Sequence, residues 1–343
     1  MTANRLLIHI GHRNTDAVPL QDALFASKNA LFSQDIYLPK FTTENLERFT
    51  LGFAPNEDVN LDRKIADHAT GPLTSHWDKI RAPHQQSGCE TIVVSNQQYF
   101  KQISTQTIDK FEDATNGIAH EKSIVAYLRA PDSHFLTLTQ QRLHQMREPT
   151  IPSRTRIKER IEPLAKAWSG TITLEVFSDV TMKNGNIVDD FVSRHLPNFD
   201  LELLVRPKAT KPRLSVEAMA LLIDRMHGRL DETVDPTSLI HQIIKADQKL
   251  QNPTQPKLRE EAAQTLNNWA APDLAWLNEN YGIRFPELDY RLIDADDVDL
   301  SLIHFTDIAQ ICDLNQDRKD ALYHKAKVRA KLPRPVQRLL SRW

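Results

Sequence analysis

The stretch HIGHRNTDAVPLQ, residues 9–21, decides the fold. It follows the apolar run RLLIHI at 5–10 and precedes residues whose apolar members recur at helical spacing, namely Leu20, Ala23, Leu24 and Leu31. A strand, a glycine-containing loop and a helix in this order can hold a phosphate, because loop amides and the positive end of the helix dipole face the anion. The lysine that usually adds a full charge to such a loop is absent from residues 11–18.

Three further short runs predict strands, and they read TIVVS (91–95), SIVAYLR (123–129) and TITLEVF (171–177). The first two of these runs, like 5–10, are apolar enough to be covered on both faces of a parallel sheet. Stretches with helical periodicity alternate with the strands, which predicts an α/β fold with a parallel sheet flanked by helices. Farther along, Ser215 is expected to cap a helix that Gly228 ends, as part of a helical C-terminal region.

The order of these segments suggests how the domains are organised. Residues 1–290 are expected to form the α/β domain, and residues 291–343 a C-terminal extension with a basic tail. Between the first two strands, residues 38–88 carry four prolines and little periodicity, namely Pro39, Pro55, Pro72 and Pro83. This length exceeds an ordinary crossover, so the segment is interpreted as an excursion over the strand ends.

Composition excludes several classes of function. The 43 basic and 45 acidic residues give a formal net charge of -2, so no global field recruits nucleic acid. Cys89 and Cys312 are far apart and predict buried thiols in a reducing compartment, which favours a cytoplasmic protein. The N-terminal apolar run is only strand-length, and no later run approaches the about 18 apolar residues of a membrane-spanning helix.

The sequence also lacks the common catalytic signatures. It contains no GxSxG, HExxH or CxxC motif and no complete Walker loop, which removes support for the usual hydrolases, metalloproteases and ATPases. The acidic stretch DADDVD at 294–299 lacks the glycine and the terminal glutamate of a calcium loop. It is interpreted as a solvated turn, and no metal is expected.

Several separated motifs together resemble the sulfotransferase superfamily, in particular bacterial sulfotransferase-like proteins with a P-loop-type fold. The family's opening segment is similar to HIGxxKTGTTSLQ, which this chain matches at His9, Ile10, Gly11, Thr15 and Gln21. The stretch YLRAPDSHFLTLTQQ matches a family strand end and helix at Tyr127, Leu128, Arg129, Pro131, Asp132, Thr137 and Gln141. A third stretch, VFSDVTMKNGNIVDDFV, matches at Phe177, Gly185, Asp190 and Phe191. With RLSVEAMALL and LNENYGIRFPE, the resemblance spans residues 5 to 287.

The resemblance implies a site for 3'-phosphoadenosine 5'-phosphosulfate (PAPS) at the carboxyl ends of the parallel strands. In the opening loop, Gly11, Asn14 and Thr15 occupy the positions that would hold the 5' phosphosulfate, with Asn14 in place of the family lysine. Arg129 and Thr137 occupy the positions that would bind the 3'-phosphate. The alternative for this pair is that Arg129 pairs with Asp132 while Thr137 bonds within its own helix.

Sulfuryl transfer needs a base for the acceptor hydroxyl and a cation for the charge that develops on the bridging oxygen. Relatives often have glutamate where this chain has Gln97, which cannot take a proton at neutral pH. His12 and Arg13, both in the loop, are therefore the candidate catalytic residues. Three histidines elsewhere are possible substitutes for the base, namely His9, His76 and His84.

Two classes of function stay open at this point. One is a sulfotransferase-like enzyme that transfers a sulfuryl group from PAPS to a glycan or another hydroxyl acceptor. The other is a non-catalytic protein of the same fold that binds a saccharide, a nucleotide or a protein partner. The basic residues from Arg318 onward, with the amphipathic end VQRLLSRW, suggest weak peripheral contact with an anionic membrane or a partner, or a solvated helix.

Overall fold

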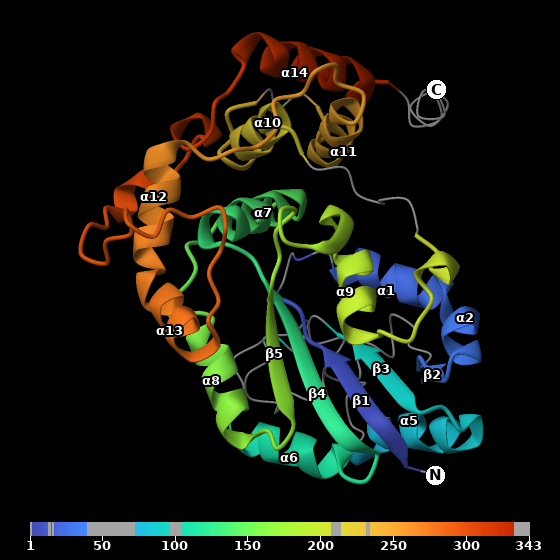
Figure 1. Ribbon diagram of the computed structural model, residues 1–343. Coiled ribbons are helices and arrows are strands. Elements are labelled where there is room, and N and C mark those ends of the chain that lie inside the picture. The colour runs from blue at the N-terminus through green and yellow to red at the C-terminus, as the bar shows by residue number, and fades with distance from the viewer. Residues whose placement is uncertain are drawn as a thin grey trace. The chain divides into compact units, whose positions relative to one another are not determined.

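A computed structural model describes residues 2–12, 15, 17–39, 73–96, 100, 105–206, 214–230 and 234–332 of the chain (Figure 1). The chain divides into two compact units. Unit 1 comprises Met1–Arg129, Thr155–Thr210 and Asp273–Leu288. Unit 2 comprises Ala130–Arg154, Lys211–Pro272 and Asp289–Trp343. The domain limit at residue 290 stays a prediction.

Unit 1 is built on a five-stranded parallel sheet (Figure 1). Its strands are β1 (Ala3–His9), β2 (Ile36–Tyr37), β3 (Thr91–Ser95), β4 (Ala119–Leu128) and β5 (Thr171–Val176). Their spatial order is β2-β3-β1-β4-β5, and every pair is parallel. The four strands expected from the sequence are all present, so the predicted α/β class with a parallel sheet is confirmed.

One face of this sheet packs against α1 (Ala17–Ala26), α2 (Lys28–Ser33) and α9 (Ile187–His195). The apolar stripe expected on the first helix lies in this core through Leu20, Ala23 and Leu24. It meets side chains from the middle strands, namely Leu7, Val93, Val125 and Tyr127. Two short helices, η2 (Lys183–Gly185) and η3 (Leu201–Leu203), flank α9.

The other face of the sheet is also shielded from solvent, because Leu6 and Ile8, which alternate with Leu7 along β1, are fully buried. Its helices are α5 (Leu73–Ser87), α6 (Thr105–Thr115) and α8 (Lys158–Ala167). Three large rings join them: Trp77 and Phe111 lie 5.5 Å apart, and Phe111 stacks on Trp168 at 5.1 Å. Both faces of the sheet are thus covered, as the apolar strands predict.

A carboxylate from the far end of the sequence fixes the start of α8. The carboxylate of Asp273, on α13 (Ala271–Tyr281), accepts the backbone N–H of Ile157 at 2.7 Å and that of Lys158 at 2.9 Å. Burial raises the pKa of Asp273 to about 6, although these two N–H groups oppose the shift. The first turn of α8 is therefore capped by a residue more than a hundred positions away.

The raised pKa of Asp273 predicts a pH-dependent stability. The folded state binds this proton more tightly than the unfolded state, so the group's contribution is greatest below its unfolded pKa of 3.8 and is lost as the pH rises through about 6. We expect the stability of the wild type relative to Asp273→Asn to fall over that window. Urea unfolding of both proteins at several pH values measures it, and a difference that stays constant with pH would contradict the prediction.

Unit 2 is helical. It contains α7 (Pro131–His144), α10 (Val216–Met226), α11 (Pro236–Asp247), α12 (Glu260–Trp269) and α14 (Gln316–Ala330), with the short helices η4 (Leu300–Leu302) and η5 (Ile308–Gln310). The Ser215 hydroxyl accepts the N–H of Ala218 at 3.1 Å, and Gly228 ends the helix with φ of 67°. The predicted cap and stop of α10 are confirmed, and its Met219, Leu222 and Ile223 lie in the core.

Two acidic residues of the stretch DADDVD each accept a hydrogen bond from a backbone N–H two residues farther along the chain. Asp294 accepts the backbone N–H of Asp296, and Asp299 accepts that of Ser301 as the cap of η4. Within the described ranges, no cluster of three histidine, cysteine or acidic residues could hold a metal ion. Across the same residues, no helix combines the length and the apolar character needed to cross a membrane.

Candidate functional site

The carboxyl ends of β1 and β4 lie side by side in unit 1. Beyond the end of β1 the chain continues along β4, because Ile10 N–H donates to Val125 O at 2.9 Å and His12 N–H donates to Tyr127 O at 3.0 Å. This places Gly11 and Arg129 at the same edge of the sheet, as the sequence predicts. Ligands of parallel α/β sheets bind outside this edge.

The loop after β1 turns sharply at Gly11 and closes at Thr15. Gly11 has φ of 51°, a left-handed backbone conformation that costs free energy for any residue with a Cβ. The N–H and hydroxyl of Thr15 both donate to His12 O, at 3.3 and 2.6 Å. The Thr15 hydroxyl hydrogen therefore serves the loop itself. Arg13, Asn14 and Asp16 lie outside the described residues.

Arg129 follows the last residue of β4 and is buried, with 6% of its surface exposed. Its guanidinium carbon lies 4.3 Å from the centroid of the Phe177 ring. Phe177 is held there because its N–H donates to Leu128 O at 2.7 Å, extending the pairing of β4 with β5. The cation–π contact orients a guanidinium at this edge, and a guanidinium is a forked, charged donor that can bind phosphate.

Thr137, the expected partner of Arg129, belongs to unit 2. It lies on α7, and its hydroxyl donates to Ser133 O at 2.9 Å. The neighbouring Asp132 carboxylate accepts the N–H of Ser133 at 2.6 Å. The bond within its own helix, the alternative for Thr137, is thus present, and it uses the hydrogen that a phosphate would need.

His12, the candidate base, is buried with 2% exposure. Its imidazole centroid lies 5.0 Å from that of Phe100, and the same Phe100 ring lies 5.5 Å from the guanidinium carbon of Arg160. Sequence reasoning missed both Phe100 and Arg160, because neither belongs to a motif. The structure therefore adds an aromatic ring and a cation to the neighbourhood of the loop.

Two of the substitute histidines serve the fold. His9 Nδ1 lies 2.9 Å from Ser95 Oγ, and Gln21 Nε2 donates to Ser95 O at 3.0 Å. Burial lowers the pKa of His9 to about 3, with a further contribution from His195, so its imidazole is neutral. His84 Nε2 lies 2.7 Å from Cys89 O, to which it donates. The side chain of His76 lies outside the described residues.

Two further residues of the motifs that carry the resemblance, Tyr127 and Asp190, contact each other in unit 1. The hydroxyl of Tyr127 donates to Asp190 Oδ2 at 2.8 Å, and Arg194 Nε donates to the same carboxylate at 2.9 Å. Burial, followed by the charge of Asp190, raises the pKa of Tyr127. The ring of His9 packs against both Tyr127 and Phe191. These positions, which carry the resemblance, thus form a hydrogen-bonded scaffold under the loop.

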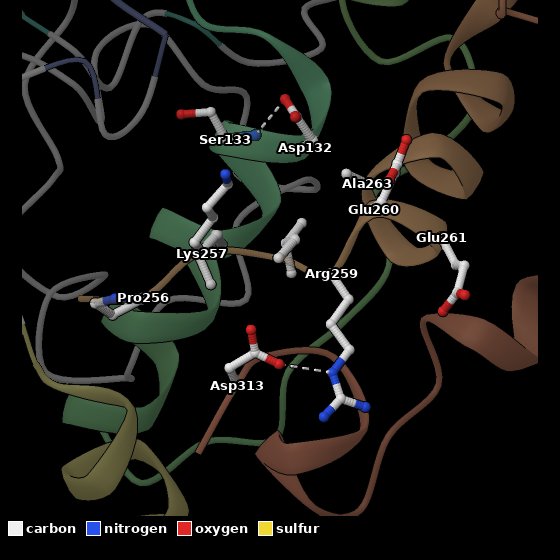
Figure 2. Close-up of a pocket in the computed structure, with 11 residues that line it drawn as sticks. Asp132, Ser133, Pro256, Lys257, Arg259, Glu260, Glu261, Ala263 and Asp313 are labelled. Atoms are coloured by element: carbon white, nitrogen blue, oxygen red, sulfur yellow. Dashed lines mark hydrogen bonds and ion pairs between the residues drawn. The ribbon is translucent and has the colours of Figure 1, made fainter. Parts of the chain in front are cut away.

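Unit 2 has a pocket of its own, of about 730 Å³. Figure 2 shows that charged side chains from the starts of α7 and α12 surround it, with Arg259 bound to Asp313 at 3.2 Å. Its lining is Asp132, Ser133, Leu136, Pro256, Lys257, Leu258, Arg259, Glu260, Glu261, Ala263 and Asp313. Of the sequence-predicted site residues that the structure describes, none lines this pocket.

The molecule is thus a parallel α/β protein. Arginine and aromatic side chains lie at the carboxyl edge of its sheet. No protein-family model matches the chain, and no curated protein sequence matches it. Among solved structures, it is similar to a sulfotransferase from Alicyclobacillus acidocaldarius, with 12% identity and a TM-score of 0.39. The likeness covers 83% of this chain and 98% of that one. A TM-score this low is too weak to assign an activity to the chain.

Proposed function

We propose that this chain is a sulfotransferase-like protein that binds a 3'-phosphorylated adenine nucleotide, PAPS or its product, at the carboxyl edge of the sheet. The observation that carries the proposal is the position of Arg129, a buried residue whose guanidinium carbon lies 4.3 Å from the Phe177 ring centroid, at the same edge of the sheet as Gly11 and His12. A forked, charged donor in a partly dry site suits a phosphate dianion. Thr137 stays a predicted second ligand of that phosphate.

The proposed reaction is sulfuryl transfer to a hydroxyl of a glycan or another acceptor. PAPS, when bound, supplies the activated sulfuryl group. Arg129 fixes the nucleotide by its 3'-phosphate, and the turn at Gly11 brings backbone amides to the edge of the sheet. His12 is proposed to accept the proton of the acceptor hydroxyl, and Arg13 to offset negative charge on the bridging oxygen. Asn14 and Thr15 complete the proposed cofactor loop.

A second function, nucleotide binding without catalysis, is favoured by one observation. The Thr15 hydroxyl donates to His12 O and so closes the loop on itself instead of offering a donor to a sulfate or phosphate oxygen. A protein of this kind would keep the Arg129 contact and use it to bind a nucleotide, a saccharide or a protein partner. In either case we propose a cytoplasmic protein that does not bind nucleic acid. The basic end of the chain is proposed for peripheral contact.

The test of the proposed function is calorimetric titration with adenosine 3',5'-bisphosphate and adenosine 5'-phosphate. The wild type is expected to prefer the bisphosphate. Replacing Arg129 with alanine should weaken the bisphosphate by about 1.5–3 kcal/mol, the range of a hydrogen bond to a charged group, or roughly 10- to 150-fold. Binding of the 5'-phosphate should hardly change.

Arg81→Ala is the matched control for this test. Arg81 lies on α5 in the same unit and donates to the carbonyls of Ala114 and Asn116, next to the amino end of β4. Its loss should leave both affinities unchanged. If the wild type binds the bisphosphate no better than the 5'-phosphate, PAPS is not the cofactor. If the wild type does prefer the bisphosphate, a turnover assay with radiolabelled PAPS and a mixed glycan acceptor separates the catalytic from the non-catalytic form.

A further inference from the structure

Unit 1 brings a second guanidinium toward the loop, from a helix that carries none of the family motifs. Arg160 lies in the first turn of α8, which begins at Lys158. Both oxygens of the Asp273 carboxylate accept backbone N–H groups at the start of this helix, from Ile157 and Lys158. The start of α8 is thereby held in place, and with it the root of the Arg160 side chain.

Phe100 connects this arginine to the loop. The ring is buried, with 2% exposure, and it contacts both the guanidinium of Arg160 and the imidazole of His12. His12 is in turn fixed by its N–H bond to Tyr127 O. The guanidinium of Arg160, the ring of Phe100 and the imidazole of His12 therefore lie next to one another at the carboxyl edge. Through these contacts the Arg160 side chain reaches the loop.

Arg160 adds a positive charge near a loop that contains no lysine. Residues 11–18 have one permanent cation, Arg13, which is already proposed to act at the bridging oxygen. A guanidinium is planar and always charged, and its N–H donors match the geometry of phosphate oxygens. A nucleotide with phosphates at both ends of its ribose needs two separate cations, and Arg129 accounts for one.

We propose that Arg160 is a second anion-binding residue of this site, and that it holds the 5' phosphate or phosphosulfate of the nucleotide whose 3'-phosphate contacts Arg129. This inference rests on the proposed function and extends it to the 5' end of the nucleotide. The two arginines divide the ligand between them, Arg160 on the side of His12 and Arg129 at the end of β4.

The experiment uses three probes, namely adenosine 3',5'-bisphosphate, adenosine 3'-phosphate and adenosine 5'-phosphate. Each is titrated calorimetrically into the full-length wild type and into Arg160→Met, Arg160→Lys and Arg129→Ala. Arg160→Met should weaken the two 5'-phosphorylated probes roughly 10-fold or more, as expected for a lost charged hydrogen bond, and leave the 3'-phosphate within about twofold. Arg129→Ala should show the opposite selectivity.

Arg160→Lys keeps the charge without the planar fork and should recover part of the lost affinity for the 5'-phosphorylated probes. The methionine variant keeps an apolar side chain of similar length against Phe100, so if Arg160 has a purely structural role, the three affinities should stay in their original ratio. That result overturns the inference. If Arg160→Met does not fold, Arg160→Lys alone decides, because unchanged affinity for all probes in that variant also overturns it.

The design separates this inference from the proposed function. If Arg129→Ala selectively loses the 3'-phosphorylated probes while the Arg160 variants bind like the wild type, the proposed function stands and the inference is wrong. If the wild type binds none of the three probes, both are wrong. Selective loss at each arginine, each for its own end of the nucleotide, supports both.

Discussion

Replacing Asp190 with alanine is expected to lower the free energy of unfolding by about 3–5 kcal/mol, because two buried donors lose their acceptor at about 1–3 kcal/mol each and a hydrogen bond to Arg194 is also lost. The Asp190 carboxylate is 1% exposed. It accepts the Tyr127 hydroxyl and the Lys183 N–H, both at 2.8 Å, and Arg194 Nε at 2.9 Å. Its loss leaves a buried phenol and a backbone amide without their acceptor.

Tyr127→Phe is the matched control, because it removes only the hydroxyl and leaves the Asp190 carboxylate with its other two donors. It should cost about 1.5–3 kcal/mol, the range of one hydrogen bond to a charged group. Urea unfolding followed by circular dichroism measures both changes. Equal losses in the two variants would show that the carboxylate has no role beyond its bond to the phenol.

Replacing Gly170 with alanine is expected to destabilise unit 1 by about 3 kcal/mol, at the upper end of the range for overpacking. Gly170 immediately precedes β5, and a Cβ built on it would lie 2.2 Å from the backbone oxygen of Lys122 in β4. A backbone oxygen inside a sheet cannot move aside as a flexible side chain would. The start of β5 would therefore have to shift away from β4.

Gly117→Ala provides the comparison in the same unit. Gly117 has φ of 69°, but a Cβ there would meet nothing within 4 Å. Only the cost of a left-handed residue should apply, about 1–2 kcal/mol. Thermal unfolding of both variants tests the contrast. A Gly170→Ala protein no less stable than Gly117→Ala would rule out the close approach of β4 and β5 at this point.

Much of the sheet could be predicted because apolar runs with β-branched residues mark strands that are covered on both faces. β1, β3 and β5 lie within two residues of their predicted limits. β4 starts at Ala119, four residues before the predicted run, because pairing with β1 continues through polar residues such as Glu121. β2 has two residues, Ile36 and Tyr37, too few to show any periodicity.

The edge of the site could be predicted in part. Gly11 and Arg129 were expected to converge because the carboxyl ends of neighbouring parallel strands meet at one edge. Phe100 and Arg160 reach the loop only through tertiary contacts, which leave no spacing in the sequence. Gln21 belonged to the opening motif, but its role required the register that sets His9 beside Ser95.

The division of the chain has a consequence for the order of folding. Each unit consists of three separated segments, so neither can be produced by cutting the chain once. All five strands are complete once Val176 has been made, yet Asp273, which caps α8, follows almost a hundred residues later. During synthesis on the ribosome, α8 is completed before Asp273 exists, and the segment Lys211–Pro272 of unit 2 is made in between. A protein truncated after residue 206 would keep the whole sheet and still lack the residue that holds the start of α8.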